Sequence, residues 1–303
     1  MAKRNLSRFN AFDIHTYASI DEFLAADVHE GISTISYKGL PLDLLNVNIG
    51  SRSTLIMFHS ALSNNMQTLP VFSGQRLAER LNMNLLSISD PSLGMDESLR
   101  LTWFMGNRRQ PLMEDLPHVL SHVVRSHHFS RPIFFGASGG GFAALLFSRT
   151  VENAITVVAN PRIDLSQSPN PNLAPYLKHC FNAVGTTPAV RVMRDNMVMQ
   201  LQADYAKGHV NDIVYLQNVK DAFFLTKNMR PFIDARRGSG TLWLLLDDYG
   251  VGHKPVPTEV LESVLRNVKV ASSWVGSGPD ELRLRKNPSV VDVDVWVDDL
   301  MSR

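Results

Sequence analysis

The chain has 303 residues, of which 44% are hydrophobic and 19% are charged, so it is long enough to bury one large core. Its 30 basic and 29 acidic residues leave a formal charge of +1, and we expect no nucleic-acid partner because no basic cluster stands out. No apolar run reaches the roughly 20 residues of a transmembrane helix, and the basic N-terminus lacks the apolar stretch of a secretory signal. With Cys180 as its single cysteine, the chain is expected to be cytoplasmic and to have no intrachain disulfide.

Short apolar runs alternate with helical patterns along most of the chain. A weak helical pattern at residues 20–26 is followed by two strands, 32–37 and 42–48, that suggest a leading hairpin. The run TLIMFH at 54–59 is apolar almost throughout, as expected of a strand covered on both faces. The later strands that we expect lie at 84–89, 131–135, 154–159, 212–217 and 242–246, and the later helices at 69–81, 115–127, 139–149 and 258–268. This alternation predicts an α/β fold with a mostly parallel central sheet covered by helices on both faces.

Two segments lie outside this alternation. Residues 161–208 are rich in Pro and Asn at first and then helical, and they have the length and position of a helical cap insertion. Residues 271–303 form a C-terminal extension, in which 290–297 (VVDVDVWV) alternate with period two and predict an added edge strand. We therefore expect a single domain whose core comprises residues 32–160 and 209–270.

The segment GASGGG at residues 136–141 is the most informative motif, because it lies between an expected strand and an expected helix. Glycines two residues before and after Ser138 permit a very tight turn that would lift the serine hydroxyl clear of the sheet. The alternative is a glycine-rich turn that cradles a phosphate. The lysine of a P-loop is missing, and this is not the first strand–turn–helix unit of the chain. We therefore favour Ser138 as a catalytic nucleophile.

A serine nucleophile needs an imidazole to accept its proton, and position selects His253 among the ten histidines. His253 lies in the loop that follows the last apolar strand, where a side chain can reach the carboxyl edge of the sheet. The alternative is an exposed loop histidine. His122, His127 and His128 lie on or near one helix without convergent carboxylates, so we expect no metal site.

The third residue should be a carboxylate that orients the imidazole. Asp221 follows the strand 212–217 after a short turn, and it gives the chain order Ser, Asp, His. Asp247 and Asp248 are rivals because they end the next strand. Their closeness to His253 in sequence makes them the weaker candidates.

Two backbone N–H groups should stabilise the oxyanion of the tetrahedral intermediate. One is that of Gly139, directly after the nucleophile. The other should come from the loop after strand 54–59, where we favour Ala61 and keep Leu62 as the alternative. His59, at the end of that strand, is expected to orient the loop by hydrogen bonding.

The strand that ends in His59, the GASGGG turn, Asp221 and His253 together resemble the α/β-hydrolase superfamily over most of residues 32–268. The resemblance implies an eight-stranded sheet with an antiparallel first strand, and ester, amide or thioester chemistry. The chain departs from the family at one point, because many members have His-Gly where this chain has His59-Ser60.

We therefore expect a serine hydrolase that forms an acyl-enzyme on Ser138 and needs no cofactor. The expected substrate is an ester, thioester or amide of a small molecule or acylated carbohydrate, since the site would lie under a cap. If an alcohol or sugar replaces water, the same residues make an acyltransferase. A non-catalytic binding protein of the same fold is a further alternative, and it predicts that a triad member is missing. Four aromatic residues are candidates for the substrate pocket, with core packing as the alternative: Trp103, Phe104, Phe181 and Tyr249.

Overall fold

The computed structural model describes residues 3–63, 68–127, 131–270 and 282–302. Contacts between Cα atoms divide the chain into two compact units. The first unit comprises Met1–Ser130 and Ser168–Met199, and the second comprises Arg131–Gln167 and Gln200–Arg303. Each unit contains strands, helices and buried apolar residues of its own.

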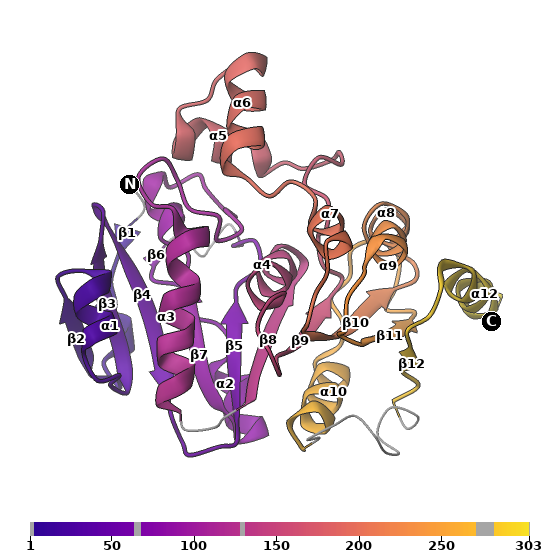
Figure 1. Cartoon of the computed structure of the whole chain (residues 1–303), viewed down its shortest axis with the longest axis horizontal. Coiled ribbons are helices and arrows are strands. Elements are labelled where there is room, and N and C mark those ends of the chain that lie inside the picture. The colour runs from indigo at the N-terminus through magenta and orange to yellow at the C-terminus, as the bar shows by residue number, and fades with distance from the viewer. Residues whose placement is uncertain (1–2, 64–67, 128–130, 271–281, 303) are drawn as a thin grey trace. The chain divides into compact units, whose positions relative to one another are not determined.

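The main strands of the first unit lie in the order β5, β7, β4, β3, β2 (Figure 1). Strands β5 and β7 are parallel and buried along their whole length, whereas β4 runs antiparallel to both β7 and β3. The predicted leading hairpin is confirmed: β3 and β4 pair across Lys38 and Gly39, whose φ angles of 48° and 94° suit a tight hairpin turn. The bounds of these strands are β2 Ile14–Tyr17, β3 Gly31–Tyr37, β4 Leu40–Val47, β5 Ser53–Phe58 and β7 Asn84–Ser89.

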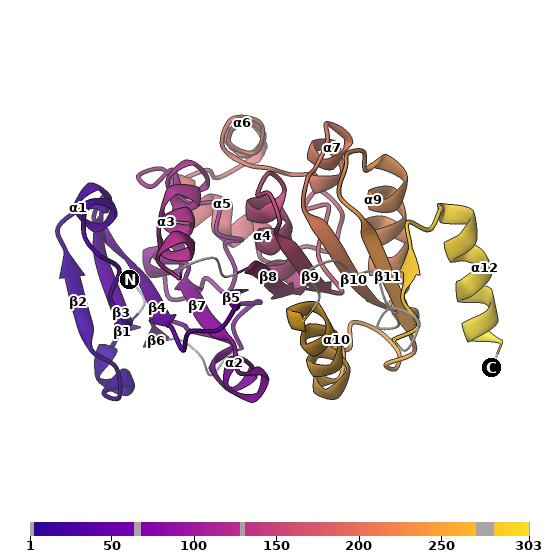
Figure 2. The same cartoon turned by 60° about the horizontal axis from the view of Figure 1, so that its bottom comes forward.

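Helices cover both faces of these strands, with α1 and α3 on one face and α2 on the other (Figure 2). Helix α3 buries Leu112, Leu116 and Val119, among others, at the spacing of a single helix face. The helices of this unit are α1 Ile20–Ala25, α2 Gln75–Leu81, α3 Leu112–Ser126, α5 Leu173–Phe181 and α6 Thr186–Asn196. Its shorter elements are β1 Lys3–Arg4, which pairs with β6 Thr68–Leu69, and the 3-10 helices η1 Leu6–Phe9 and η2 Pro91–Met95.

The helix predicted over residues 69–81 is wrong in its first half, because α2 begins only at Gln75. Leu69 precedes Pro70, and a residue before proline is disfavoured in the helical conformation. Gly74 then has φ +88° and a side chain there would collide with Met57, so the chain turns sharply before the helix starts.

The strands of the second unit lie in the order β12, β11, β10, β9, β8. All neighbours are parallel except β12, which runs antiparallel to β11. In Figure 2, helix α10 lies on one face of β8–β11, and α4, α7 and α9 lie on the other. The strands are β8 Arg131–Ala137, β9 Ile155–Ala159, β10 Asp212–Asn218, β11 Leu242–Asp247 and β12 Arg285–Lys286. The helices are α4 Ser138–Ser148, α7 Leu201–Ala206, α8 Ala222–Phe224, the π-helix η3 Leu225–Met229, α9 Arg230–Ala235, α10 Thr258–Val270 and α12 Val290–Met301. The predicted α/β class, with mostly parallel strands between helices, is confirmed.

The edge strand predicted at 290–297 is wrong, because these residues belong to helix α12. Ser289 caps the helix in a reciprocal capping box with Asp292. Val293, Trp296 and Val297 are buried, at the i, i+3, i+4 spacing of a helix face. The capping box and the buried helix face stabilise a helix here, although the sequence alternates with period two. The part of the predicted extension at residues 271–281 lies outside the described residues.

Residues 161–208, predicted to be a helical insertion, form α5 and α6 in the first unit and α7 in the second. Helix α6 has no buried residue, whereas α5 buries Tyr176, Leu177 and Cys180. Across the described residues, no helix combines the length and apolar character that a bilayer span requires.

Candidate active site

The turn between β8 and α4 carries Ser138 in a strained conformation. Ser138 has φ 49°, in the left-handed region that side chains other than glycine rarely adopt. A Cβ on Gly136 would lie 2.1 Å from the carbonyl oxygen of Gly140, and one on Gly141 would lie 2.7 Å from Pro161 Cβ. Close packing therefore requires glycine at 136, two residues before the serine as the motif predicts, and at 141, one residue beyond the second glycine of the motif.

The second unit brings Ser138, His253 and Asp221 into one hydrogen-bonded chain. Ser138 Oγ lies 3.0 Å from His253 Nε2, and His253 Nδ1 lies 2.6 Å from Asp221 Oδ2. The carboxylate side chain is 5% exposed and the imidazole 40%, so a buried carboxylate orients an imidazole that stays open to solvent. A carboxylate on Nδ1 favours the tautomer whose Nε2 lone pair faces the hydroxyl, which is the arrangement that a general base requires.

Asp221 lies just after the end of β10. It is held there by a backbone hydrogen bond and by the hydrogen bond with which it caps α8. Its Oδ1 accepts a hydrogen bond from the N–H of Phe224 at 3.2 Å, so the carboxylate also caps this short helix. Its backbone N–H donates to the carbonyl of Asn218. These bonds leave Oδ2 directed at His253.

The two rival carboxylates have other partners. Asp247 Oδ2 lies 2.7 Å from Arg283, and Asp248 Oδ2 lies 2.6 Å from Lys220. Hydrogen bonding to Lys220 lowers the pKa of Asp248. Of the three candidates, Asp221 is therefore the one with a hydrogen bond to His253 in this structure.

The loop that carries His253 is fixed by two buried asparagines that sequence reasoning missed. Asn218 Nδ2 donates to the carbonyls of Gly250 and Gly252 at 2.8 and 2.9 Å, and its Oδ1 accepts from the N–H of Tyr249. Asn160 Nδ2 donates to the carbonyl of Lys254, and its Oδ1 accepts from the N–H of Asn218. Both asparagines end or directly follow parallel strands, and that shared position was the signal that could have revealed them.

An aromatic and cationic layer, also missed from the sequence, packs behind the imidazole. The ring of Phe224 stacks on His253 with centroids 4.0 Å apart and planes 22° apart. The Arg162 guanidinium carbon lies 4.9 Å from the ring centroid of Phe223 and 5.8 Å from that of Phe224. The backbone N–H of Arg162 donates to the carbonyl of Ser138 at 2.9 Å. One buried arginine thus contacts both the backbone of Ser138 and the aromatic ring behind His253.

The expected oxyanion donors lie in different units. Gly139 is buried in the first turn of α4, where unpaired N–H groups and the helix dipole favour negative charge. Ala61 and Leu62 follow β5 in the first unit, and the N–H of Leu62 already donates to the carbonyl of Arg100 at 2.9 Å. Their participation in an oxyanion hole stays a prediction, with Ala61 the candidate that we retain.

His59 is buried next to the same loop. Its Nδ1 lies 2.9 Å from the carbonyl oxygen of Ser60, and its ring packs against Phe104 at 4.8 Å. Burial lowers the pKa of His59, which keeps the imidazole neutral. Asp90, a buried carboxyl whose pKa is raised by burial, accepts hydrogen bonds from Thr102 Oγ1 and the N–H of Phe104. His59 thus contacts the backbone at Ser60, and Asp90 holds the backbone at Phe104.

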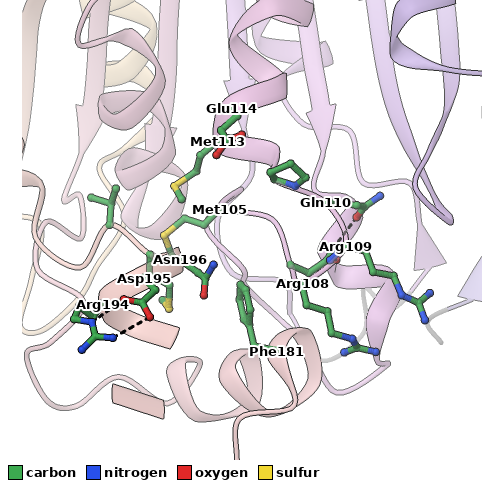
Figure 3. Close-up of a pocket in the computed structure, with 14 residues that line it drawn as sticks. Met105, Arg108, Arg109, Gln110, Met113, Glu114, Phe181, Arg194, Asp195 and Asn196 are labelled. Carbon is green, nitrogen blue, oxygen red and sulfur yellow. Dashed lines mark hydrogen bonds and ion pairs between the residues drawn. The ribbon is translucent and has the colours of Figure 1, made fainter. Parts of the chain in front are cut away.

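The aromatic residues predicted to line a pocket differ in their surroundings. Trp103 and Phe104 are 1% and 0% exposed and pack edge-on against Tyr176 and Phe58, as core residues do. Tyr249 has a buried hydroxyl without a hydrogen-bond partner in the described part of the chain. Phe181 lines a pocket of about 410 Å³ within the first unit (Figure 3). Substrate contact by any of the four remains a prediction.

Two of the other histidines have structural partners. His127 is buried between Thr54 and Asn46, and His122 Nε2 donates to the carbonyl of Ala26. His128 lies outside the described residues. Within those residues, no three His, Cys, Asp or Glu side chains are grouped so that they could hold a metal ion.

This fold is that of the α/β-hydrolases. A capsule O-acetyltransferase variant of Neisseria meningitidis serogroup A, in complex with CoA, superposes with a TM-score of 0.52 at 16% identity over 71% of this chain and 89% of that one. A propionate-bound thermophilic esterase from Thermogutta terrifontis gives 0.48 at 12% identity, over 78% and 92% of the two chains. A dienelactone hydrolase from Anabaena variabilis gives 0.46 at 15% identity, over 80% and 96%. No protein-family model and no curated protein matches the sequence.

Proposed function

We propose that this protein is a serine hydrolase that cleaves an ester, thioester or amide of a small molecule or acylated carbohydrate. The observation that supports the proposal best is the continuous hydrogen-bond chain from Ser138 Oγ through His253 to the buried carboxylate of Asp221. A protein of this fold that only bound a ligand would have no need for a base aligned on a strained serine.

In the acylation step, His253 Nε2 accepts the hydroxyl proton while Ser138 Oγ forms a bond to the carbonyl carbon. The electron pair of the C=O bond moves to oxygen, and the N–H group of Gly139 stabilises the oxyanion. When the carbonyl re-forms, the bond to the leaving group breaks and His253 donates its proton to that group. Asp221 stays ionised and stabilises the imidazolium throughout.

In the second step, His253 removes a proton from water, and the resulting hydroxide oxygen bonds to the acyl carbon. The bond from that carbon to Ser138 Oγ breaks, the acid leaves, and the serine recovers its proton from His253. The pathway needs no redox change.

A second candidate is acyl transfer, in which an alcohol or sugar hydroxyl replaces water as the acceptor. The structural similarity to the capsule O-acetyltransferase, whose structure contains CoA, favours acyl transfer. The same residues would then take an acyl group from a thioester and release the thiol before the acceptor binds.

The experiment is a chain-length series of p-nitrophenyl esters, assayed with and without sugar acceptors. Hydrolysis that disappears in Ser138→Ala supports the hydrolase. An acylated sugar formed at the expense of free acid supports the transferase. If the folded wild type turns over none of these esters with or without sugar acceptors, the catalytic proposal is wrong.

A further inference from the structure

The pocket of the first unit is built from residues that the proposed reaction does not use. Its volume of about 410 Å³ lies in the range of small-molecule sites. It is lined by residues between Met105 and Glu114, by Phe181 at the end of α5, and by residues 194–198 around the end of α6 (Figure 3). One side of the pocket carries Arg108 and Arg109, and the other side carries methionines.

Arg108 and Arg109 occupy the tip of a tight turn whose base is rigid. Asn107 and Gln110 exchange two backbone hydrogen bonds of 3.0 Å, and Asn107 Nδ2 donates to Gln110 Oε1 at 2.7 Å. Both amide side chains are buried, and Gln110 Nε2 also donates to the carbonyl of Leu40. Because these buried groups are satisfied by one another, the turn holds the backbone of both arginines in place before any ligand arrives.

The positive charge of this turn is not compensated nearby. Arg108 Nη1 donates to two neutral acceptors, Asn182 Oδ1 at 3.0 Å and the carbonyl of His179 at 3.3 Å. In the described ranges, neither Arg108 nor Arg109 has a carboxylate at ion-pair distance. An anion could therefore bind there without displacing a carboxylate partner.

The other charges of the pocket are separated from this turn. Arg194 is bonded to Asp195 through two hydrogen bonds of 2.6 and 3.0 Å, and Figure 3 shows this pair on the opposite side of Phe181 from Arg108. Glu114 lies in the first turn of α3, where the helix dipole favours a carboxylate. Among the described charged residues that line the pocket, Arg108 and Arg109 are the cations without a carboxylate partner, and Glu114 leaves the lining with a net charge of +1.

The apolar side of the pocket is formed mainly by Met105, Met113, Met197 and Phe181. Met105 and Met197 are buried, whereas Met113 and Phe181 are half-buried. Unbranched methionine side chains adapt to differently shaped apolar groups, and an aromatic ring offers a flat surface.

We propose that this pocket binds an amphipathic anion. A phosphate or carboxylate group contacts the guanidinium groups of Arg108 and Arg109, and an attached aliphatic or aromatic group packs against the methionines and Phe181. The planar guanidinium group matches the oxygen atoms of a phosphate or a carboxylate in geometry. The expected occupant is therefore an anion and not a neutral ligand. The proposal does not depend on the reaction at Ser138.

The test is calorimetric titration of the full chain carrying Ser138→Ala with n-hexyl phosphate, hexanoate and 1-hexanol. We expect at least one anion to bind about tenfold more tightly than the alcohol, and added salt to weaken that anion only. Arg108→Gln and Arg109→Gln should each weaken anion binding about five- to tenfold and leave the alcohol unchanged. The tighter of the two anions identifies the group that the pocket prefers.

The matched control is Arg125→Gln, which removes an exposed arginine of α3 outside the pocket and should leave all three affinities unchanged. Unfolding temperatures of all variants check that the turn still folds. Equal affinity for the alcohol and both anions would overturn the proposal, as would unchanged anion binding in a folded Arg109→Gln.

Discussion

The ring of Phe224 lies nearly parallel to the imidazole of His253, with the two centroids 4.0 Å apart. Phe224 is buried, and its N–H also donates to the carboxylate of Asp221, so one residue contacts both partners of the proposed nucleophile. The imidazole is thus restrained by a hydrogen bond in its plane and by an aromatic surface against its face.

We expect Phe224→Leu to lower kcat roughly tenfold while KM changes little, because the imidazole loses the surface that fixes its plane relative to Ser138. The measurement is steady-state ester hydrolysis. Phe224→Tyr should keep most of the activity. Phe223→Leu is the matched control, since Phe223 contacts Arg162 without stacking on His253. Equal losses in the Phe223 and Phe224 variants would argue against a specific effect on the base.

Asn218→Ala should destabilise the protein by about 1–3 kcal/mol, because it removes two hydrogen bonds to half-buried carbonyls of the His253 loop. The rate of ester hydrolysis should fall by more than the loss of folded protein explains, because the loop that carries His253 is then held less firmly. Urea unfolding and ester hydrolysis measure the two effects. Asn267→Ala serves as the control, because the one hydrogen bond of that amide to a described residue is to the carbonyl of Ser263 within α10. A stable Asn218 variant with full activity would exclude this role.

Asp221→Asn should reduce kcat at least about a thousandfold, because an amide in place of the carboxylate favours the wrong tautomer and cannot stabilise the imidazolium. In Asp247→Asn and Asp248→Asn, kcat should fall severalfold at most, since these carboxylates form ion pairs with Arg283 and Lys220 instead. The comparison uses one ester at one pH. A larger loss in either rival would reassign the acid.

Stability should fall as the pH drops below about 6.5, partly through His209. Burial lowers the pKa of His209 in the folded protein, and its Nδ1 lies 3.0 Å from the carbonyl of Asn211. The unfolded chain therefore takes up a proton below its pKa of 6.5 before the folded protein does, which favours unfolding. The stabilising contribution is present above that pH and is lost toward the lowered pKa, at up to about 1.4 kcal/mol per pH unit.

His209→Phe should make this pH dependence shallower, because phenylalanine can keep the packing against Tyr205 and cannot bind a proton. Urea unfolding of the wild type and the variant at pH 7.5 and pH 5.5 provides the measurement. If the two proteins lose the same free energy of unfolding between these pH values, His209 does not contribute.

The residues of the proposed triad could be selected from the sequence because each occupies a position that the chain order constrains. Ser138 lies between an apolar strand and a helix, and Asp221 and His253 follow the ends of later strands. These features depend on local pattern and on the order of elements, both of which a single sequence contains. The parallel strands could be predicted for the same reason, since buried runs such as that of β5 are short and continuous.

The residues that hold the site together could not be selected in this way. Asn160, Asn218 and Phe224 act through contacts between loops that are distant in sequence, and their residue types are common in loops and cores. Arg162 resembles any loop arginine until the chain folds around it. The error at α12 has a related cause, because valines alternating with aspartates fit a strand pattern until the cap at Ser289 and the buried face of Val293 and Trp296 are known.

The most direct measurement is the intact mass of the protein after reaction with a fluorophosphonate, followed by peptide mapping. The proposed triad predicts one adduct on Ser138 in the wild type, none in Ser138→Ala, and much slower labelling in His253→Ala. A folded wild type that remains unlabelled, or an adduct on a different residue, would contradict it.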